Sequence, residues 1–284
     1  MRPLKASTGL VCLLGYPVEH SRSPEIHNAA FAAAGSDLVY LAFAVPPDLL
    51  AAAVEGIRAL GLRGANVTVP HKQAVMEHID AVDQLAARIG AVNTIVNRNG
   101  CLKGYNTDSC GFLTSLTEQG FNPQGKNVLV LGAGGAARAI TFALLEAGCK
   151  RLIIANRKRE KAEALAAALA AYGVSPEACS LTGPELAARL PEVELVVNAT
   201  SVGMWPEQEN TPLPPSWLQA GQWVYDLVYT PRETRLLREA RQRGCHTLSG
   251  LSMLLHQGAK AFELWTGVPA PLAVMRQVLE RSEK

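Results

Sequence analysis

Four short polar segments of the chain could carry chemistry, and each follows a run of apolar residues. They are Ser21-Arg22-Ser23-Pro24, the heptapeptide NVTVPHK from Asn66 to Lys72, Asn93, and Asn106-Thr107-Asp108. Open α/β sheets hold their ligands at strand ends, so these segments are candidates for one binding site. Together they offer hydroxyls, amides, one ammonium group and one carboxylate, a set that suits a polyhydroxylated carboxylic acid.

A glycine-rich segment later in the chain could bind a dinucleotide. Gly132, Gly134 and Ala137 match the pattern G-x-G-x-x-G/A, directly after an apolar run and at the expected start of a helix. Gly132 would permit the tight turn, Gly134 would let the backbone approach a pyrophosphate, and Ala137 would keep helix and sheet close. The N–H groups and positive dipole end of the helix would then face the phosphates. A merely tight strand-to-helix turn is the alternative, and the flanking elements favour the nucleotide.

The residues after the next apolar run indicate which dinucleotide is expected. An NAD site usually places Asp or Glu there for the ribose 2′-hydroxyl, whereas this chain has Asn156 followed by Arg157, Lys158 and Arg159. A guanidinium can bind a 2′-phosphate with two hydrogen bonds, so this segment predicts NADP. Lys161 lies four residues after Arg157 on the expected helix, so both cations should face the same side. A solvated basic helix start is the alternative, but the helix dipole disfavours cations at this end.

The elements that must position these residues follow from the hydrophobic pattern. Apolar runs rich in Val, Ile and Leu alternate with Ala/Leu/Glu-rich segments at helical spacing, which predicts an α/β fold with parallel strands and crossover helices. Two apolar runs flank Asn99-Gly100 and predict a hairpin, because both residues tolerate positive φ. The Pro-rich segment 203–217 should be a surface loop. Strands are expected near 9–14, 38–44, 64–68, 126–131, 151–156, 193–198, 223–228 and 245–248, and helices near 24–34, 47–60, 250–265 and 271–282. A glycine turn followed by a helix is expected within 132–148.

Composition limits the classes of protein that fit. The 284 residues, 48% of them hydrophobic, are enough for two domains. A formal charge of +2, without a run of five like charges, predicts neither a nucleic-acid partner nor a membrane partner. Six widely spaced cysteines without a C-x-x-C pair argue against a metal site and a disulfide framework. The first fifteen residues lack a long apolar stretch and no segment reaches the roughly 18 apolar residues of a membrane span, so a cytoplasmic location is expected.

The motifs resemble those of the shikimate dehydrogenase family. The resemblance rests on SRSP, NVTVPHK, GAVNT, GYNTDSCGF, GAGGAARA, NRKREKA, NATSVGM, DLVYTPRETRLL and GLSMLLHQGAKAFELWTG, in family order over nearly the whole chain. It implies a discontinuous α/β substrate domain, 1–107 completed by the helices of 252–284, and a Rossmann-like, doubly wound NADP-binding domain at 108–251. It also implies the reversible NADP-dependent reduction of 3-dehydroshikimate to shikimate, in aromatic amino-acid biosynthesis, by a monomer or homodimer.

The resemblance places the family's catalytic pair on Lys72 and Asp108. Reduction of a ketone by hydride generates an alkoxide that must be protonated, and a positioned side chain can supply the proton. We therefore expect Lys72 to transfer the proton and Asp108 to orient it. Taken alone, Lys72 would be an exposed surface lysine and Asp108 a helix N-cap.

The resemblance also assigns the binding residues. The two serine hydroxyls would receive the substrate carboxylate, and the amides and a threonine would bind ring hydroxyls. Ser23 could instead be an N-cap, and Asn66 could satisfy loop backbone. The neighbouring His71 is expected to be structural. The substrate contacts are Ser21, Ser23, Asn66, Thr68, Lys72, Asn93, Asp108, Tyr229 and Gln257.

The cofactor contacts that the resemblance implies are spread over five segments. They are Gly132, Ala133, Gly134, Gly135, Ala136, Asn156, Arg157, Lys158, Lys161, Asn198, Thr200, Ser201, Gly203, Leu227, Gly250 and Met253. Met253 could equally be a core methionine. Three positions depart from the common family pattern: Ser252 replaces glycine, Lys158 replaces threonine, and Lys161 replaces arginine, so the expected preference for NADP is moderate.

Two other functions fit part of the pattern. A quinate/shikimate dehydrogenase would use the same catalytic pair with relaxed substrate and cofactor choice, and the retained Arg157 speaks mildly against it. A nucleotide-binding regulator would have kept the fold and lost the reaction. The presence of both Lys72 and Asp108 argues against that reading.

Overall fold

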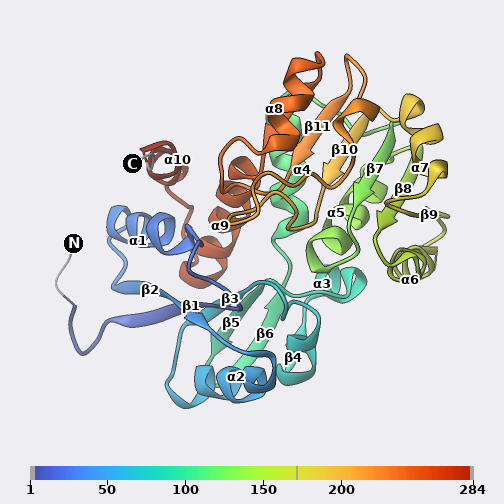
Figure 1. Cartoon of the computed structure of the whole chain (residues 1–284). Coiled ribbons are helices and arrows are strands. Elements are labelled where there is room, and N and C mark those ends of the chain that lie inside the picture. The colour runs from blue at the N-terminus through green and yellow to red at the C-terminus, as the bar shows by residue number, and fades with distance from the viewer. Residues whose placement is uncertain (1–3, 171, 282–284) are drawn as a thin grey trace. The chain divides into compact units, whose positions relative to one another are not determined.

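Two six-stranded sheets organise the chain (Figure 1), and the computed structural model describes residues 4–170 and 172–281. Unit 1 comprises Met1–Gly111 and Leu254–Lys284, and unit 2 comprises Phe112–Met253. The divisions fall inside α4 (Asp108–Glu118) and α9 (Leu251–Thr266). The resemblance puts them a few residues earlier, at 107/108 and 251/252. The predicted α/β fold is confirmed, because each sheet is interleaved with helices along the chain.

The sheet of unit 1 is mixed. β1 lies parallel to β2 and β3, whereas β5 is antiparallel to β3 and β6. Asn99 and Gly100 have φ values of 55° and 88°, so the predicted hairpin between β5 and β6 is confirmed. The order is β2-β1-β3-β5-β6-β4, with β1 Gly9–Gly15, β2 Leu38–Ala44, β3 Gly64–Val67, β4 Ala81–Val82, β5 Thr94–Arg98 and β6 Cys101–Tyr105.

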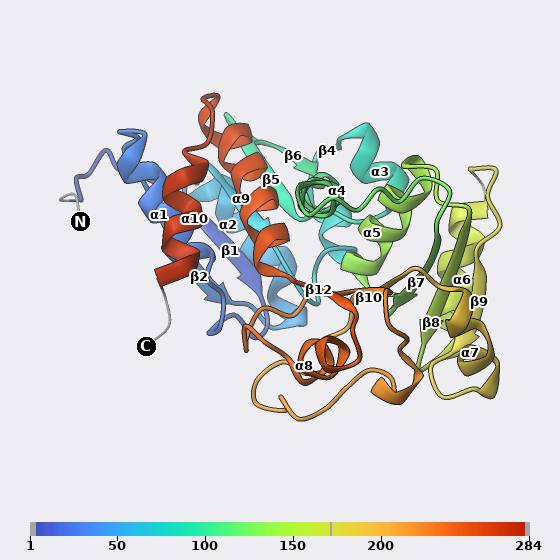
Figure 2. The ribbon, with the colours of Figure 1, turned by 90° about the horizontal axis from the view of Figure 1, so that it is seen from above.

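Helices cover both faces of this sheet. Helix α2 (Leu50–Ala59) packs Val54 and Ile57 onto one face, against residues of β1, β3 and β5. On the other face, α1 (Ser23–Ala33), α9 and α10 (Leu272–Arg281) lie beside one another (Figure 2). Trp265 of α9 donates its indole N–H to the carbonyl of Ile95, 2.9 Å away, which fastens α9 to the sheet.

Unit 2 has an entirely parallel sheet, the arrangement expected of a doubly wound nucleotide-binding fold. Helices α7 and α8 pack on one face, and α4 packs on the other by stacking Phe112 on Tyr225. The strand order is β12-β11-β10-β7-β8-β9, with β7 Asn127–Leu131, β8 Arg151–Asn156, β9 Glu177–Ser180, β10 Leu195–Asn198, β11 Trp223–Asp226 and β12 His246–Ser249. The helices are α4, α5 (Gly135–Glu146), α6 (Arg159–Ala170), α7 (Pro184–Arg189) and α8 (Arg235–Gln242).

Several elements lie outside the sequence expectations. β4, β9, α3 (Gln84–Ile89) and α7 were not predicted, because each has six residues or fewer and shows little periodicity. Helix α8 was also not predicted, although its sequence is amphipathic and its Leu236, Leu237 and Ala240 are buried. The expected helix at 47–60 begins as a 3₁₀ turn, Pro47–Leu49. The segment 203–217 is largely exposed, as predicted, but Leu213 is buried in the core of unit 2.

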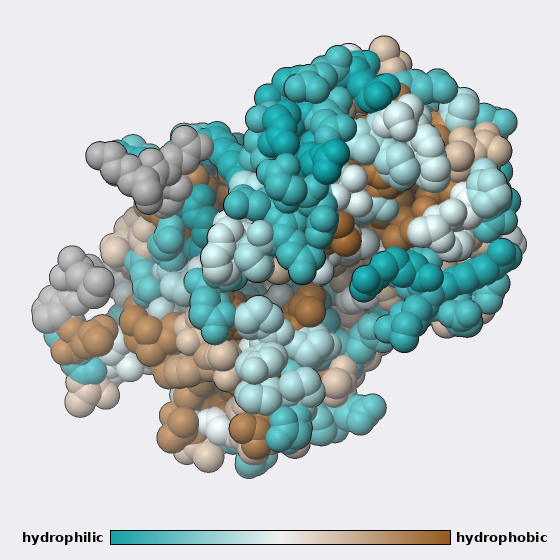
Figure 3. Space-filling view, viewed as in Figure 1, coloured by the Kyte–Doolittle hydropathy of each residue, from teal (hydrophilic) through white to brown (hydrophobic). Residues whose placement is uncertain are grey.

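The surface of unit 1 carries exposed apolar side chains on its edge strand. In Figure 3 hydrophobic residues are brown, and they form an area at the lower left, over the region of β2 and α2. Leu41 and Phe43 of β2 are 46% and 41% exposed. None of the helices in the described part of the chain has the length and apolarity needed to cross a membrane.

Candidate active site

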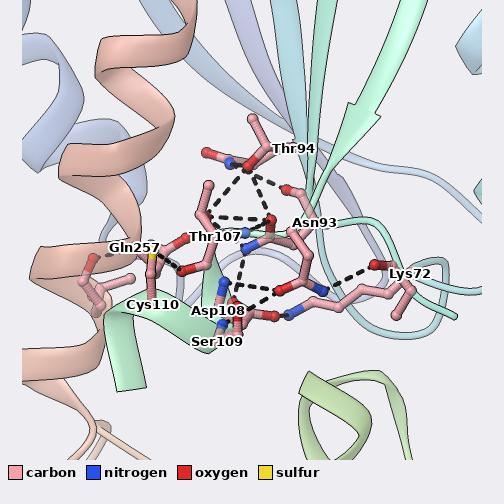
Figure 4. Close-up of polar contacts among 12 residues, drawn as sticks. Lys72, Asn93, Thr94, Thr107, Asp108, Ser109, Cys110 and Gln257 are labelled. Atoms are coloured by element: carbon pink, nitrogen blue, oxygen red, sulfur yellow. Dashed lines mark hydrogen bonds and ion pairs between the residues drawn. The ribbon is translucent and has the colours of Figure 1, made fainter. Parts of the chain in front are cut away.

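The centre of the site is an ion pair in unit 1 (Figure 4). The Lys72 Nζ lies 2.6 Å from Asp108 Oδ2, and the two side chains are 13% and 5% exposed. Lys72 is therefore not the exposed surface lysine that its type alone would suggest. A cation and an anion removed from water stabilise each other only when their geometry and remaining hydrogen bonds are good, so such a pair is costly to build.

Backbone contacts hold the turn that carries Lys72. This turn connects β3 to the 3₁₀ helix Ala74–His78. The buried His71 ring donates Nε2–H to the carbonyl of Val45 at 2.7 Å, since a carbonyl can only accept. The Lys72 carbonyl accepts the N–H of Val92 at 2.7 Å. His71 is thus structural, as expected. Its ring bonds the backbone of Val45, whereas the ammonium group of the neighbouring Lys72 contacts Asp108.

Asp108 is presented by the first turn of α4. Asn106 Oδ1 accepts the backbone N–H groups of Asp108 and Ser109, at 3.0 and 3.4 Å. Asn106 therefore caps this helix, and the alternative reading of Asp108 as the N-cap is wrong. The Asp108 carboxylate is instead used by Lys72 and by Asn93, whose Nδ2 donates to Oδ1 at 2.8 Å.

The amide of Asn93 is fully used by protein partners. Its Nδ2 donates to Asp108 and to Thr107 Oγ1, and its Oδ1 accepts from the Thr107 N–H and the Thr94 hydroxyl, all within 3.0 Å. Because the Thr107 N–H can only donate, the orientation of this amide is fixed. Asn93 thus presents an N–H to the Asp108 carboxylate, and a ligand would have to displace a protein partner to reach it.

Asn66 joins the same network from β3. Its Nδ2 donates to the carbonyl of Asn93 and to Thr94 Oγ1, both at 3.1 Å. The alternative role of Asn66, satisfying backbone, is therefore observed alongside the side-chain contact. The structure brings four predicted residues together in one buried cluster: Asn66, Lys72, Asn93 and Asp108.

The other predicted substrate residues of unit 1 lie on neighbouring elements. Ser23 is buried and is the first residue of α1, and the N-cap position is occupied by Arg22, so the alternative reading of Ser23 as an N-cap is wrong. Ser21 Oγ accepts the Ser23 N–H at 3.3 Å. Thr68 follows β3. The side-chain amide of Gln257, in α9, donates to the carbonyl of Leu254. Gly111 of α4 lies so close to this residue that a Cβ added to Gly111 would be 2.7 Å from the backbone nitrogen of Gln257.

The glycine-rich turn of unit 2 is tight and leaves the start of α5 uncovered. Gly132 has φ +114°, and an added Cβ would lie 3.0 Å from the Ala199 carbonyl. Gly134 is the N-cap of α5 and has no side chain to cap the helix, and no atom lies within 4 Å of an added Cβ there. Ala137 is completely buried. The helix N-terminus is therefore open for an anion such as a pyrophosphate, and the residues present fit the nucleotide.

The cations after β8 are exposed, but their geometry differs from the expectation. Helix α6 begins at Arg159, so Arg157 precedes it, and the rule for residues four apart on one helix does not relate it to Lys161. Arg159 is bound by Glu163 and Glu185. Among the described residues Arg157 has no ion-pair partner, which leaves its guanidinium available for a phosphate.

The segment after β10 is organised by a second buried network. Asn198 Nδ2 donates to Asp226 Oδ1 at 2.9 Å and to the carbonyl of Val202, and its Oδ1 accepts from the N–H and hydroxyl of Thr200. Asp226 Oδ2 accepts the hydroxyl of Thr234, the N-cap of α8, at 2.6 Å. Burial raises the pKa of Asp226 to about 6, opposed by these hydrogen bonds from neutral groups. Asn198 is thus a structural residue of the loop that carries Thr200, Ser201 and Gly203.

The last predicted cofactor residues lie at the ends of β11 and β12. An added Cβ on Gly250 would be 2.1 Å from the Leu227 carbonyl, so glycine is required for this approach. Met253 is buried, which agrees with its alternative reading as a core residue. The hydroxyl of Ser252, which replaces the family's common glycine, is buried without a hydrogen-bond partner. Tyr229 follows β11 in unit 2 and is partly exposed.

Sequence reasoning missed two members of the cluster in unit 1. Thr94 links Asn66 to Asn93, and its position directly after Asn93 in GAVNT was the available signal. Tyr40 donates its hydroxyl to Asn66 Oδ1 at 2.7 Å, and no local pattern connects these two residues. In the described ranges, no group of three or more His, Cys, Asp or Glu side chains is arranged to hold a metal ion.

Three family models match successive parts of the chain. They are the shikimate dehydrogenase substrate binding domain over residues 13–95, shikimate / quinate 5-dehydrogenase over 115–204, and the shikimate 5′-dehydrogenase C-terminal domain over 250–280. A shikimate dehydrogenase (NADP(+)) of Moorella thermoacetica is 61% identical over 99% of this chain and 96% of the relative. The chain belongs to the shikimate dehydrogenase family.

Solved structures of shikimate dehydrogenases have the same fold. One in complex with NADP+ superposes with a TM-score of 0.92 at 41% identity, over 99% of this chain and 98% of that one. The enzyme of Thermus thermophilus, in complex with NADP(H) and shikimate, has a TM-score of 0.86 at 39% identity, over 97% of this chain and 100% of that one. The shikimate dehydrogenase fold therefore extends over both units of this chain.

Proposed function

We propose that this protein catalyses the reversible, NADP-dependent reduction of 3-dehydroshikimate to shikimate. The observation that carries the proposal is the 2.6 Å contact between Lys72 Nζ and Asp108 in a buried amide and hydroxyl network. This arrangement can exchange a proton and bind hydroxyls, as interconversion of a ketone and an alcohol on a hydroxylated ring requires. The relatives' names and ligands support the same reaction.

Lys72 is the proposed proton donor and acceptor. In the reducing direction the carbonyl carbon gains a hydride, the carbonyl oxygen becomes an alkoxide, and Lys72 supplies the proton that completes the alcohol. In the oxidising direction the lysine removes that proton as the hydride leaves. Asp108 accepts a hydrogen bond from Nζ and so orients it, while Asn93 holds the carboxylate from its other oxygen.

Unit 2 is the proposed NADP-binding domain. The bound nicotinamide supplies or takes up the hydride. The open N-terminus of α5 would hold the pyrophosphate. Arg157, which has no ion-pair partner in the described part of the chain, would bind the 2′-phosphate with support from Lys158 and Lys161. The loops carrying Thr200 to Gly203 and Leu227 to Tyr229 are proposed to complete the site, with Gly250 and Met253 beside them.

Unit 1 is the proposed substrate domain. Ser21 and Ser23 would receive the carboxylate of shikimate, and Asn66, Thr68 and the other predicted contacts would bind its hydroxyls. Asn93 would do so by exchanging one of its protein partners for the substrate. Other small acids carry 2-hydroxy or carbonyl groups that would not reach all of these side chains. Some of the side chains would then lack hydrogen-bond partners, and an unpaired buried polar group costs about 1 to 3 kcal/mol.

A substrate-by-cofactor matrix tests the proposal. Shikimate and quinate are each supplied with NADP and with NAD, and reduced nicotinamide is followed by its absorbance. Fast turnover of shikimate with NADP is the expected result. Comparable turnover of quinate, or of NAD, would instead identify a quinate/shikimate dehydrogenase. Binding of NADP without turnover of either acid would identify the nucleotide-binding regulator.

We further infer a cytoplasmic enzyme that acts as a monomer or homodimer. The absence of a disulfide among the six described cysteines supports the location, because disulfides are rare in a reducing compartment. Light scattering of the purified chain would decide between the two assembly states.

A further inference from the structure

The geometry points to Tyr40 as a positioning residue that sets which hydrogen bond Asn66 can offer to the substrate. This inference deepens the proposed function and rests on it, because it concerns the same substrate site. Tyr40 lies in β2, two strands away from Asn66 in β3, with β1 between them. Its hydroxyl crosses that strand to donate to Asn66 Oδ1 at 2.7 Å, and Tyr40 is completely buried.

Two consecutive residues of α1 fix Tyr40 in place. The ring of His27 stacks on the Tyr40 ring with centroids 4.6 Å apart and planes 14° from parallel. Asn28 accepts the Tyr40 backbone N–H at 2.8 Å and donates to its carbonyl at 2.9 Å. Both nitrogens of the buried His27 lack hydrogen-bond partners, and burial lowers the pKa of His27 to about 3. The His27 ring that packs against Tyr40 is therefore neutral, so an imidazolium charge does not compete with Asn66 for the Tyr40 hydroxyl.

The hydrogen bonds that continue from Tyr40 all run in one direction. Tyr40 donates to Asn66, Asn66 donates to Thr94, and Thr94 donates to Asn93. Asn93 then donates to Asp108, which also accepts from Lys72. Backbone groups fix the direction, because the Asn93 carbonyl can only accept from Asn66 and the Thr107 N–H can only donate to Asn93.

This direction limits what Asn66 can do for a ligand. Both hydrogens of its Nδ2 are taken by the Asn93 carbonyl and Thr94, and one lone pair of Oδ1 is taken by Tyr40. An amide oxygen has two lone pairs, so one acceptor position remains. Asn66 therefore acts as a hydrogen-bond acceptor that recognises a hydroxyl group of the substrate. It has no free N–H to donate to a carbonyl oxygen at the same place. Tyr40 holds that oxygen in position and polarises it.

Loss of the tyrosine hydroxyl should weaken substrate binding without altering the chemical step. Shikimate binding is measured by calorimetry on the whole chain without cofactor, for the unaltered protein, Tyr40→Phe, Asn66→Ala and the double variant. Tyr40→Phe should raise the dissociation constant about three- to tenfold, the usual range for one hydrogen bond. In turnover assays KM for shikimate should rise by a similar factor, with kcat unchanged.

The double variant separates this role from a general structural one. If Tyr40 acts through Asn66, Tyr40→Phe should have no further effect on binding once Asn66 is alanine. Tyr225→Phe is the matched control, because it removes the same atom from a buried tyrosine of unit 2 that bonds Ser115 at 2.5 Å. It should lower the melting temperature comparably and leave the shikimate dissociation constant unchanged.

Three outcomes would overturn the inference. They are an unchanged dissociation constant in folded Tyr40→Phe, an equal loss of binding in the Asn66→Ala background, and a fall in kcat alone. If Tyr40→Phe does not fold, the hydroxyl proton of Tyr40 in the unaltered protein provides the test, since its NMR signal should shift when shikimate is added. An unshifted signal would contradict the inference. Failure of the unaltered protein to bind shikimate would instead refute the proposed function.

Discussion

Two buried aspartates, one in each unit, have been placed in opposite electrostatic surroundings. Asp108 of unit 1 meets the ammonium group of Lys72 and the amide of Asn93. Asp226 of unit 2 meets the amide of Asn198, the hydroxyl of Thr234 and the N–H of Val228, all of them neutral. Burial raises the pKa of Asp226 to about 6, because no cation offsets the lost hydration of the carboxylate.

The difference separates a carboxylate beside the proposed proton donor from one that joins two loops of unit 2. In unit 1 the charged partner is a group that can exchange a proton, and it retains some contact with solvent. In unit 2 the carboxylate is enclosed and connects the loop after β10 with the first turn of α8. Removing a partner should therefore affect the rate in unit 1 and stability in unit 2.

The largest effect is expected from Lys72→Ala. This variant should lower kcat by about 10² to 10⁴ fold with little change in KM, because the loss falls on proton transfer in the transition state. Steady-state kinetics of the folded variant with shikimate and NADP provides the measurement. Lys103→Ala is the control, since Lys103 is an exposed lysine of the same unit and lies over the Tyr105 ring. A near-normal kcat in Lys72→Ala would remove this lysine from the mechanism.

Asp226→Asn should change how stability depends on pH. The native pKa of about 6 lies above the usual 3.8, so the folded protein binds the proton more tightly than the unfolded chain does. The contribution of Asp226 is therefore most favourable below pH 3.8 and is lost as the pH rises through about 6. Each pKa unit corresponds to about 1.4 kcal/mol, so asparagine should gain roughly 2 to 3 kcal/mol relative to aspartate over this range.

Urea unfolding of both proteins across this pH range measures the change. Asp80→Asn should show the opposite trend, because hydrogen bonds from the Leu102 N–H and Arg58 lower the pKa of Asp80. Its stabilising contribution is present at higher pH and is lost as the pH falls. Parallel curves for Asp226→Asn and the unaltered protein would show that the enclosed carboxyl does not titrate as its surroundings indicate.

Arg157→Ala should weaken NADP more than NAD. The guanidinium has no protein partner among the described residues, whereas a charge-assisted contact with the 2′-phosphate is worth roughly 1.5 to 3 kcal/mol. Arg159→Ala is the matched control, because its guanidinium is already bound by Glu163 and Glu185. Dissociation constants of both nucleotides give the result, and equal losses for NADP and NAD would assign Arg157 a structural role.

The smallest effect is the preference for shikimate over quinate. No predicted contact is evidently added for the extra hydroxyl of quinate, and an unpaired buried hydroxyl costs about 1 to 3 kcal/mol. This corresponds to roughly five- to 150-fold in kcat/KM if the cost persists in the transition state. Measurement at saturating NADP and one pH tests it. Similar kcat/KM values would mean that water or a serine accepts the hydroxyl.

The sequence allowed the main elements to be predicted, because their patterns are strong. The long apolar runs became β1, β2, β7 and β8, and the Asn99-Gly100 turn formed the expected hairpin. β4 has two residues and β9 has the four-residue sequence EACS, so neither is long enough to carry a usable period. The start of α6 was misplaced because its basic residues continue on both sides of the boundary at Arg159.

The sequence motifs predicted several residues of the candidate site, but not the hydrogen bonds that join them to residues outside the motifs. The motifs identified Lys72, Asp108, Asn93 and Asn66, and these side chains lie in one cluster. The role of Tyr40 depends on strand register: Tyr40 pairs with Val11, and Asn66 lies across from Leu13 two residues further along β1. Local sequence does not encode which strands become neighbours in a sheet, so this contact required the structure.

The clamp of Asn28 on Tyr40 has a consequence for solubility. β2 is the last strand of its sheet, it carries no charged residue, and Leu41 and Phe43 are exposed on it. An edge of this kind invites pairing with strands of other molecules. The Asn28 amide accepts from the Tyr40 N–H and donates to the Tyr40 carbonyl, the two bonds that a foreign strand would otherwise make in the middle of β2. The side chain of Asn28 thus occupies the backbone groups at the sheet edge to which a strand of another molecule would bind.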